Sequence, residues 1–340
     1  MIKTLIIDDS ALARDIIRDF LEADENFKII GEAADGEEGI EKILSLNPDL
    51  VTMDIDMPKK NGLETIKEVM KKVYVPIVVI TNHDTAKTAY EATLLGALEF
   101  YPKDAFSLSQ DQKKLQAVYE TLKRISGVKA QQKAVFDETI LQKQFEKREI
   151  QAVVIASSTG GPKALSQFLA LLPGNFPVPI VIVQHNSSGF DESFSQWLNT
   201  YTPLNVKLAE EGEIPKPGAV YVAQTDKHLE IRLTNEQKCC LYYNDDEPEN
   251  NQKPAADVLF KTAAKNLKQS VISVVLTGMG SDGAAGTQKI REMGGITLAQ
   301  NEESSLIYGM PKAAAETGCV DMVLPLDRIP GELVKLTMSN

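Results

Sequence analysis

Through residues 1–125, short apolar runs alternate with segments whose apolar residues recur at helical spacing. This alternation limits the fold more than any other feature of the sequence. We expect strands at Lys3–Ile7, Lys28–Ala33, Leu50–Met53, Ile77–Ile80 and Leu98–Tyr101. We expect helices at Ser10–Ala23, Gly36–Leu46, Leu63–Lys71, Thr85–Leu95 and Ser109–Ile125. Strands and helices that alternate through short loops predict a doubly wound parallel sheet.

A second α/β region follows a polar segment. Residues 126–149 are rich in Lys and Gln, and we interpret them as a linker that is partly helical. The α/β pattern resumes at Ile150, and three strand-like runs then predict a β-hairpin region at Ala219–Ala223, His228–Leu233 and Lys238–Tyr243. The sequence therefore predicts two α/β domains, 1–125 and 150–340, of which the second is larger, mainly parallel and carries a β-hairpin insertion.

Composition narrows the class of protein. The chain has 340 residues, 43% of them hydrophobic, which suits two globular domains. A formal net charge of -12 argues against non-specific binding to nucleic acid or to an anionic membrane. The three cysteines do not suggest a disulfide framework, the N-terminus is unlike a signal peptide, and no apolar run approaches the ~20 residues of a membrane span. We expect a cytoplasmic protein without membrane insertion.

Three acidic residues follow strands of the first domain. Asp8 and Asp9 end the first strand, and Asp54 ends the third. Since these strand ends are neighbours in a doubly wound sheet, their oxygens suit Mg²⁺ and an incoming phosphoryl group. Thr81 and Lys103 end the last two strands and add a hydroxyl and a cation. A single such Asp is more often a helix cap, but the whole set favours a phosphate-related site.

These motifs resemble response-regulator receiver domains, which have a five-stranded flavodoxin-like fold. The matching segments are Asp8-Asp9-Ser10-Ala11-Leu12, Met53-Asp54-Ile55-Asp56-Met57-Pro58 and Asn61-Gly62-Leu63. The resemblance implies that Asp54 is phosphorylated and that Mg²⁺ is held by Asp8, Asp9, Asp54 and the backbone carbonyl of Asp56. It also implies that Thr81 and Tyr101 are switch residues and that Lys103 contacts the phosphoryl group. The family usually has Pro after this lysine, whereas this chain has Asp104.

Three strands of the second domain end in residues typical of serine hydrolases. Val153–Ala156 leads into Ser157-Ser158-Thr159-Gly160-Gly161, Ile180–Val183 into Gln184-His185, and Val271–Leu276 into a glycine-rich segment that contains Asp282. Parallel strands bring their carboxyl ends to one edge of a sheet, so these residues can meet there. A serine on a sharp strand-to-helix turn, an imidazole and a carboxylate together predict nucleophilic acyl chemistry.

Each of these residues taken alone has a simpler interpretation. The Ser-Thr-Gly-Gly turn equally suits a phosphate group at a helix N-terminus. His185 could be structural, and Asp282 could cap a turn or helix. A histidine immediately after a buried strand favours the hydrolase, because a phosphate site needs none there. Ser157 and Ser158 are both candidate nucleophiles, and the choice between them rests on the alignment of Thr159-Gly160-Gly161.

The second domain resembles the chemotaxis protein-glutamate methylesterases. The resemblance rests on Ser158-Thr159-Gly160-Gly161, Gln184-His185, Asp226-Lys227-His228, Asp257-Val258-Leu259-Phe260, Leu276-Thr277-Gly278-Met279-Gly280 and Gly309-Met310-Pro311. It implies that Ser158 is the nucleophile, His185 the general base and Asp282 the residue that orients His185. The backbone N–H groups of Thr159 and Met279 are implied as oxyanion or positioning donors. This sequence departs from the family pattern at Ser157, Asn186–Ser188, Gln224–Thr225 and Lys253. These departures affect loops and leave the three catalytic positions intact.

The two resemblances together imply a phosphorylation-activated esterase. It would release methanol from glutamate methyl esters on chemoreceptors by a Ser-His-Asp mechanism, and deamidation of receptor glutamines is a possible second activity. The implied partners are the histidine kinase of a chemotaxis-type pathway and methylated chemoreceptors, with Mg²⁺ in the receiver domain and no cofactor in the catalytic domain.

Other functions stay open at this point. A non-catalytic, receiver-controlled signalling adaptor would keep the first domain's chemistry only, and a nucleotide- or phosphate-binding module would use Ser158–Gly161. A DNA-binding output domain is disfavoured, because no basic helix-turn-helix stretch follows the linker.

Overall fold

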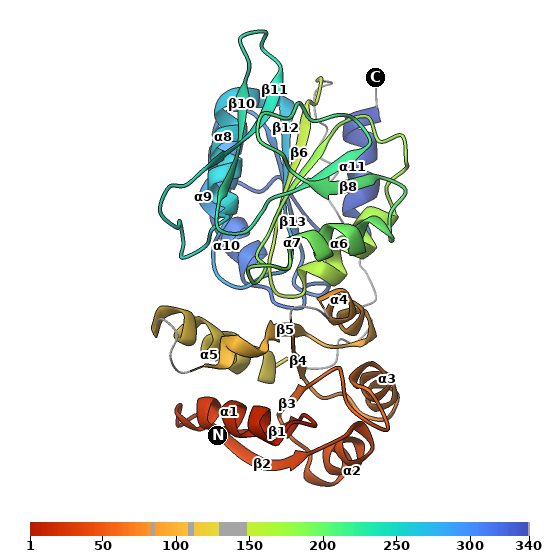
Figure 1. The fold of residues 1–340 in the computed structure, drawn as a ribbon. Helices are drawn as coiled ribbons and strands as arrows, with labels where there is room; N and C mark the ends of the chain where they lie inside the picture. Colours follow the sequence, from red (N-terminus) through yellow and green to blue (C-terminus); the bar gives the residue numbers. More distant parts are fainter. Residues whose placement is uncertain (83–85, 108–111, 129–147, 339–340) are drawn as a thin grey trace. The chain divides into compact units, whose positions relative to one another are not determined.

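The chain forms two compact units, Met1–Ala130 and Gln131–Asn340, in the computed structural model (Figure 1). The structure describes residues 1–82, 86–107, 112–128 and 148–338. Most of the expected linker at 126–149, and the expected first residues of two helices, Thr85 and Ser109, lie outside these ranges.

The N-terminal unit contains a parallel sheet of five strands in the order β2-β1-β3-β4-β5. The strands are β1 (Ile2–Ile7), β2 (Phe27–Ala33), β3 (Leu50–Met53), β4 (Ile77–Thr81) and β5 (Glu99–Pro102). The helices are α1 (Ala11–Glu22), α2 (Gly36–Leu46), α3 (Gly62–Lys72), α4 (Ala86–Leu95) and α5 (Gln112–Ser126). Figure 1 shows α1 and α5 on one face of the sheet and α2, α3 and α4 on the other. The predicted doubly wound fold is confirmed, and its elements lie within a few residues of the expected bounds.

Side-chain caps determine where three of these helices begin. Ser10 accepts a hydrogen bond from the backbone of α1, Asp35 accepts two from α2, and Asn61 accepts one from α3. Each cap satisfies donors that the first turn of a helix leaves unpaired. Strands β3 and β4 are buried along their whole length, as expected for parallel strands covered by helices on both faces.

The C-terminal unit contains a parallel sheet of seven strands in the order β14-β13-β12-β6-β7-β9-β8. These are β6 (Ala152–Ser157), β7 (Ile180–Gln184), β8 (Asn205–Leu208), β9 (Ala219–Val222), β12 (Val271–Val275), β13 (Ile296–Gln300) and β14 (Met322–Leu324). A separate antiparallel hairpin pairs β10 (His228–Leu233) with β11 (Cys239–Asn244). The larger, mainly parallel domain with a hairpin insertion is therefore confirmed.

One strand was placed wrongly from the sequence. Ala219–Ala223 was expected in the hairpin region, but β9 lies in the main sheet between β7 and β8. A fully buried four-residue apolar run carries no periodic signal that distinguishes a hairpin strand from a strand of the main sheet.

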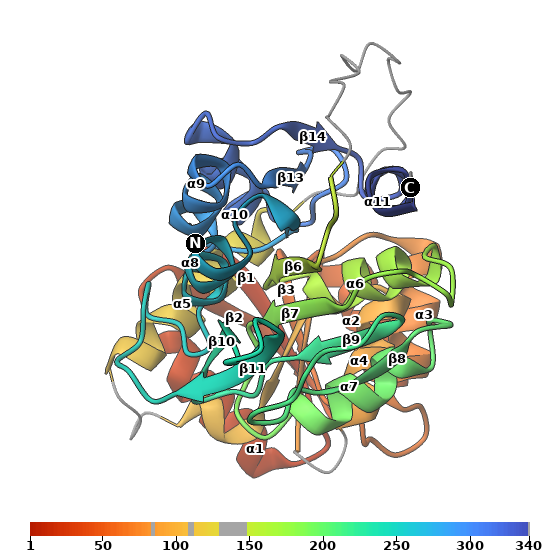
Figure 2. The same cartoon turned by 90° about the horizontal axis from the view of Figure 1, so that it is seen from above.

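Helices cover both faces of the larger sheet. One face carries α8 (Ala256–Leu267), α9 (Ala284–Glu292) and α10 (Met310–Glu316), and the other carries α6 (Gly161–Ala170), α7 (Asp191–Asn199) and α11 (Ile329–Met338), as Figures 1 and 2 both show. Buried side chains of β6, β7 and α8 form part of one hydrophobic cluster, including Val154, Ala156, Val181, Val183, Leu259 and Phe260. The central strands that carry the expected catalytic loops therefore lie in a buried hydrophobic core.

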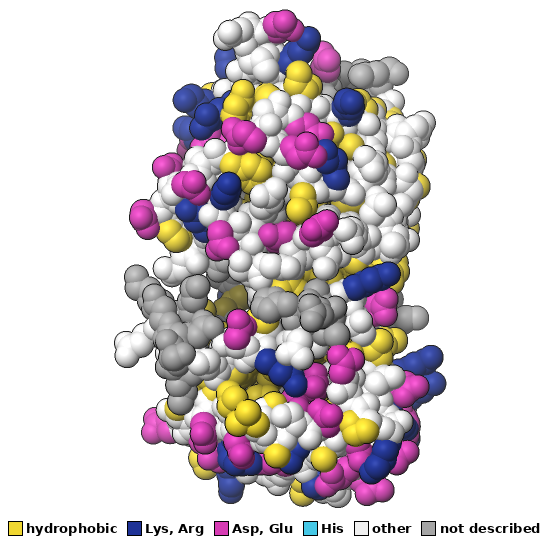
Figure 3. Space-filling view, in the orientation of Figure 1, with side chains coloured by type: hydrophobic (Ala, Val, Ile, Leu, Met, Phe, Trp, Pro, Cys, Tyr) yellow, Lys and Arg dark blue, Asp and Glu magenta, His cyan; other side chains and the backbone are white. Residues whose placement is uncertain are grey.

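The surface shows no separation of charge on the face drawn in Figure 3, where acidic and basic side chains are interspersed over both units. None of the helices in the described part of the chain has the length and apolar character that crossing a bilayer requires.

Candidate functional site

Three adjacent strands bring the expected serine, histidine and aspartate loops to one edge of the larger sheet. Strand β6 pairs in parallel with β12 on one side and with β7 on the other. Ser157 and Gln184 are in register, so Ser158 and His185 follow paired positions at two neighbouring strand ends. The backbone N–H of Ser158 also donates to the carbonyl of Thr277 at 3.1 Å, which ties this turn to the loop after β12.

His185 and Asp282 form a buried hydrogen-bonded pair. Nε2 of His185 lies 2.9 Å from Oδ2 of Asp282, and the two side chains are only 7% and 2% exposed. Burial acts to raise the pKa of Asp282, but the hydrogen bond and charge interaction with His185, together with backbone N–H donors, outweigh it and lower that pKa. Asp282 is therefore a carboxylate at neutral pH, and Nε2 of His185 donates a proton to it.

Backbone donors hold Asp282 in place. Its Oδ2 accepts from the N–H of Ala256 at 2.6 Å, and its Oδ1 accepts from the N–H groups of Asp257 and Gly283, both at 3.0 Å. The side-chain amide of Asn250 bridges Asp282 and Asp257 at 3.3 and 2.8 Å. Sequence reasoning quoted Asp257 within a motif but assigned no role to it or to Asn250. Main-chain donors leave no residue-type signal, so this support could not be predicted.

The second imidazole nitrogen of His185 is available for a proton. Nδ1 is buried and has no hydrogen-bond partner among the described residues. Since Nε2 carries the proton that bonds to Asp282, the free lone pair of a neutral ring lies on Nδ1. The structure thus holds the ring by one nitrogen and leaves the other as a base.

The two candidate nucleophiles have different surroundings. The side chain of Ser157 is fully buried, and its hydroxyl donates to Oε1 of Gln184 at 2.7 Å. Ser158 is half-buried and lies against Gly278, where an added Cβ would come within 2.8 Å of the Ser158 Cβ. Of the two serines, Ser158 is the less buried, which favours it over Ser157.

The expected oxyanion donors lie beside Ser158. Thr159 is buried in the turn between β6 and α6, and its carbonyl accepts from the hydroxyl of Thr277 at 3.0 Å. Gly160 caps α6 with a φ of 77°, a left-handed conformation that favours glycine. Met279 directly follows Gly278, which contacts Ser158. Thr159 therefore directly follows the proposed nucleophile on the loop after β6, and Met279 is one residue from this contact on the loop after β12.

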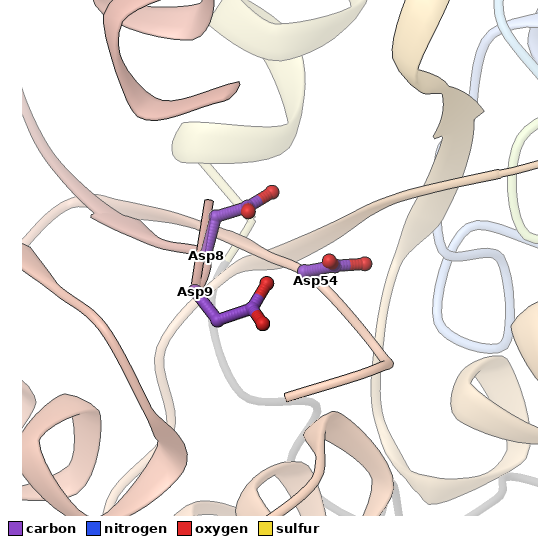
Figure 4. A group of neighbouring side chains, drawn as sticks. All are labelled: Asp8, Asp9 and Asp54. Atoms are coloured by element: carbon purple, nitrogen blue, oxygen red, sulfur yellow. The ribbon is translucent and has the colours of Figure 1, made fainter. Parts of the chain in front are cut away.

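A carboxylate cluster marks the corresponding edge of the smaller sheet. Side-chain oxygens of Asp8, Asp9 and Asp54 all lie within 4.8 Å of one another. Figure 4 shows the three side chains extending from the ends of β1 and β3. Nζ of Lys103 lies 2.7 Å from Asp54 and 2.8 Å from Asp8, although Asp104 and not proline follows it. The exposed side chain of Asp56 is not part of the cluster.

The carboxylates of this cluster repel one another, and Lys103 pairs with two of them. Burial is the main influence that raises the pKa of Asp54, and Asp8 raises it further, although the hydrogen bond with Lys103 opposes this shift. Burial acts to lower the pKa of Lys103, but Asp54 and Asp8 outweigh it and raise that pKa. Hard carboxylate oxygens that repel one another at this distance fit Mg²⁺.

The expected switch residues follow strands β4 and β5. Thr81 is fully buried at the end of β4, in register with Pro102, which precedes Lys103. Tyr101 packs edge-on against Phe106, with ring centroids 6.0 Å apart, and its hydroxyl interacts with Thr121 of α5. The structure therefore places Thr81 and Lys103 at adjacent strand ends and Tyr101 beside α5.

Comparisons with known proteins match both units. The family described as CheB methylesterase matches residues 153–333, and the response regulator receiver domain family matches residues 4–120. A protein-glutamate methylesterase/protein-glutamine glutaminase of Pyrococcus abyssi is 38% identical over 98% of this chain and 93% of its own length. One of the same name from Thermotoga maritima is 37% identical over 99% of this chain and 98% of its own length. The crystal structure of the Thermotoga maritima CheB methylesterase catalytic domain is 42% identical, with a TM-score of 0.54, and covers 56% of this chain and 100% of that chain.

Proposed function

The chain belongs to the CheB methylesterase family and carries a receiver domain, and we propose from this that it hydrolyses glutamate methyl esters on chemoreceptors and releases methanol. The observation that carries the proposal is the buried His185–Asp282 pair at the sheet edge where Ser158 lies. The relatives are named for activity on protein glutamate and glutamine side chains, which is consistent with this substrate class.

Ser158 is the nucleophile in the proposed reaction. Its Oγ bonds to the ester carbonyl carbon while its proton passes to Nδ1 of His185, the nitrogen that Asp282 does not engage. The bond from this carbon to the methoxy oxygen then breaks, and His185 returns the proton to the departing methanol. Water adds to the acyl-enzyme with His185 again as base, which regenerates Ser158 and leaves a glutamate carboxylate.

Asp282 and two backbone donors stabilise the charges of this reaction. Asp282 keeps the proton of the neutral imidazole on Nε2 and stabilises the ring when Nδ1 becomes protonated. The backbone N–H groups of Thr159 and Met279 are the proposed donors to the oxyanion, as the family resemblance implies. The start of helix α6 beside Ser158 adds a favourable dipole for negative charge.

Deamidation of receptor glutamines is the second proposed activity. A glutamine side chain has the shape of the methyl ester with an amino group in place of the methoxy group. The same attack by Ser158 breaks the C–N bond instead, and the proton held by His185 leaves with ammonia. Hydrolysis of the same acyl-enzyme then gives the same glutamate product.

The receiver is proposed to control the esterase through phosphorylation of Asp54 by the histidine kinase of a chemotaxis-type pathway. Asp8, Asp9, Asp54 and the backbone carbonyl of Asp56 would hold Mg²⁺, which supplies charge neutralisation for phosphoryl transfer. Lys103 is proposed to contact the phosphoryl oxygens, and its ion pair with Asp54 supports this role. Thr81 and Tyr101 would then respond as the switch residues.

Methanol release from methylated receptor membranes tests the proposal. We expect Ser158→Ala to abolish release by the full-length protein and Ser157→Ala to retain most of it. Addition of a small-molecule phosphodonor with Mg²⁺ should raise the activity of the wild type but not of Asp54→Ala. Undiminished release by Ser158→Ala would exclude the esterase mechanism, whereas equal responses of wild type and Asp54→Ala to the phosphodonor would exclude only the regulation.

A further inference from the structure

Gln184 contacts the main chain on both sides of the proposed catalytic pair. It is the last residue of β7, and its side chain is 2% exposed. Its amide NH₂ group donates to the carbonyl oxygen of Ser158 at 3.1 Å and to that of His185 at 2.8 Å. One buried amide therefore links the backbone of the nucleophile to the backbone of the base.

The surrounding groups determine which way this amide faces. Two carbonyl oxygens can only accept hydrogen bonds, so the NH₂ end must face Ser158 and His185. The hydroxyl of Ser157 donates to the Oε1 end at 2.7 Å. A reversed amide would place an oxygen against two other oxygens in a buried site, which is strongly unfavourable.

Gly161 leaves the space that this arrangement needs. A Cβ at position 161 would lie 1.9 Å from Oε1 of Gln184. The backbone N–H of Gly161 also donates to the carbonyl of Ser158 at 2.7 Å. The Ser158 carbonyl therefore accepts two hydrogen bonds, one from Gln184 and one from the start of α6, and its direction is closely defined.

The direction of this carbonyl determines the direction of the oxyanion donor. The carbonyl of Ser158 and the N–H of Thr159 belong to the same planar trans peptide, in which they point in opposite directions. When Gln184 holds the carbonyl on its own side, the N–H must point to the other side. We propose that Gln184 is a positioning residue that aims the Thr159 N–H at the reacting carbonyl oxygen, an inference that rests on the proposed function.

Two substitutions of Gln184 test this role in the full-length protein. Gln184→Met keeps the length and burial of the side chain but removes both donors. Gln184→Glu keeps its shape and places an anionic oxygen against the two carbonyls. Since an oxyanion donor acts mainly in the transition state, we expect kcat for methanol release to fall by about 10- to 100-fold with KM nearly unchanged. Affinity for a boronic acid that forms a tetrahedral serine adduct should fall by a similar factor.

Asn266 offers a matched control. Its side-chain amide also donates to two backbone carbonyls of this unit, those of Ile231 at 2.8 Å and Thr262 at 2.9 Å, and neither belongs to a proposed catalytic residue. Asn266→Leu should lower the melting temperature and leave kcat unchanged. The inference is overturned if a folded Gln184→Met or Gln184→Glu keeps wild-type kcat, or if its lower activity is fully explained by the loss of folded protein. Loss of activity in Ser158→Ala in the same assay would show that the proposed function holds, even if the Gln184 variants contradict the positioning role.

Discussion

Replacement of Asp282 by asparagine probes the proposed mechanism most directly. Asp282 accepts hydrogen bonds on both carboxylate oxygens, and Oδ2 alone receives His185 Nε2 at 2.9 Å and the Ala256 N–H at 2.6 Å. Asparagine keeps one acceptor oxygen. If that oxygen stays with the N–H groups of Asp257 and Gly283, the new NH₂ group faces two donors at the position of Oδ2.

Two separate losses follow from this geometry. A buried Ala256 N–H without an acceptor costs about 1–3 kcal/mol of stability. His185 can bond to the new NH₂ group only if Nε2 becomes the acceptor, which moves the ring proton to Nδ1 and removes the lone pair that the proposed mechanism needs there. This wrong tautomer lowers kcat by about 10⁴-fold in a serine protease with the same triad. The pKa of Asp282 is lowered in the folded protein, so its carboxylate stabilises the fold at neutral pH. The difference in free energy of unfolding between wild type and Asp282→Asn should therefore be largest at neutral pH and decrease as the pH falls through that pKa.

Asp257→Asn is the matched control for this prediction. Asp257 is a second buried carboxylate of the same network, where it accepts from Gly286 at 2.6 Å and Asn250 at 2.8 Å but does not bond to His185. Methanol release under single-turnover conditions and thermal melts should be measured on both variants. We expect Asp257→Asn to change stability and to lower kcat less than tenfold. If a folded Asp282→Asn stays within about tenfold of wild type, the Ser-His-Asp assignment is wrong; equal loss in both variants would refute the specific role of Asp282.

Three further perturbations have outcomes that follow from single contacts. Burial raises the pKa of Asp54, so its charged carboxylate lowers the free energy of unfolding above pH 3.8. Asp54→Asn should therefore raise the melting temperature of the receiver domain at pH 7, and this gain should disappear in acid. Calorimetry should also show a smaller response of this variant to Mg²⁺ than of the wild type. Gly278→Ala places a Cβ 2.8 Å from the Cβ of Ser158, so it should lower the free energy of unfolding by about 1–3 kcal/mol and also lower kcat. An unchanged kcat would show that the turn at Ser158 can shift without loss of activity. The side chain of His228 accepts a hydrogen bond from the Ala255 N–H at 3.1 Å. Denaturant titration should find His228→Leu less stable than His228→Asn, because the asparagine oxygen can replace that acceptor. Equal unfolding midpoints of the two variants would contradict this prediction.

The sequence was sufficient to predict the five-stranded sheet and three central strands of the larger one, β6, β7 and β12, because these strands are short apolar runs. The ends of β1, β3, β6 and β7 were each expected within a residue or so, and β1 with β3 and β6 with β7 are neighbours, as the parallel topology requires. The error at β9 shows the limit of this reasoning. Burial on both faces removes the alternation that distinguishes one kind of strand from another, so the partners of a short buried strand depend on contacts with distant segments.

Most of the site that could not be predicted depends on main-chain groups, whose direction no residue type reveals. The carboxylate of Asp282 was expected to orient His185, but its position depends on the N–H groups of Ala256 and Asp257. Gln184 appeared in the sequence only as the neighbour of His185, yet it bonds to the carbonyls of Ser158 and His185. A residue that acts on the backbone of catalytic residues is visible only in the fold, so substitutions like those at Gln184 test what motif matching leaves unassigned.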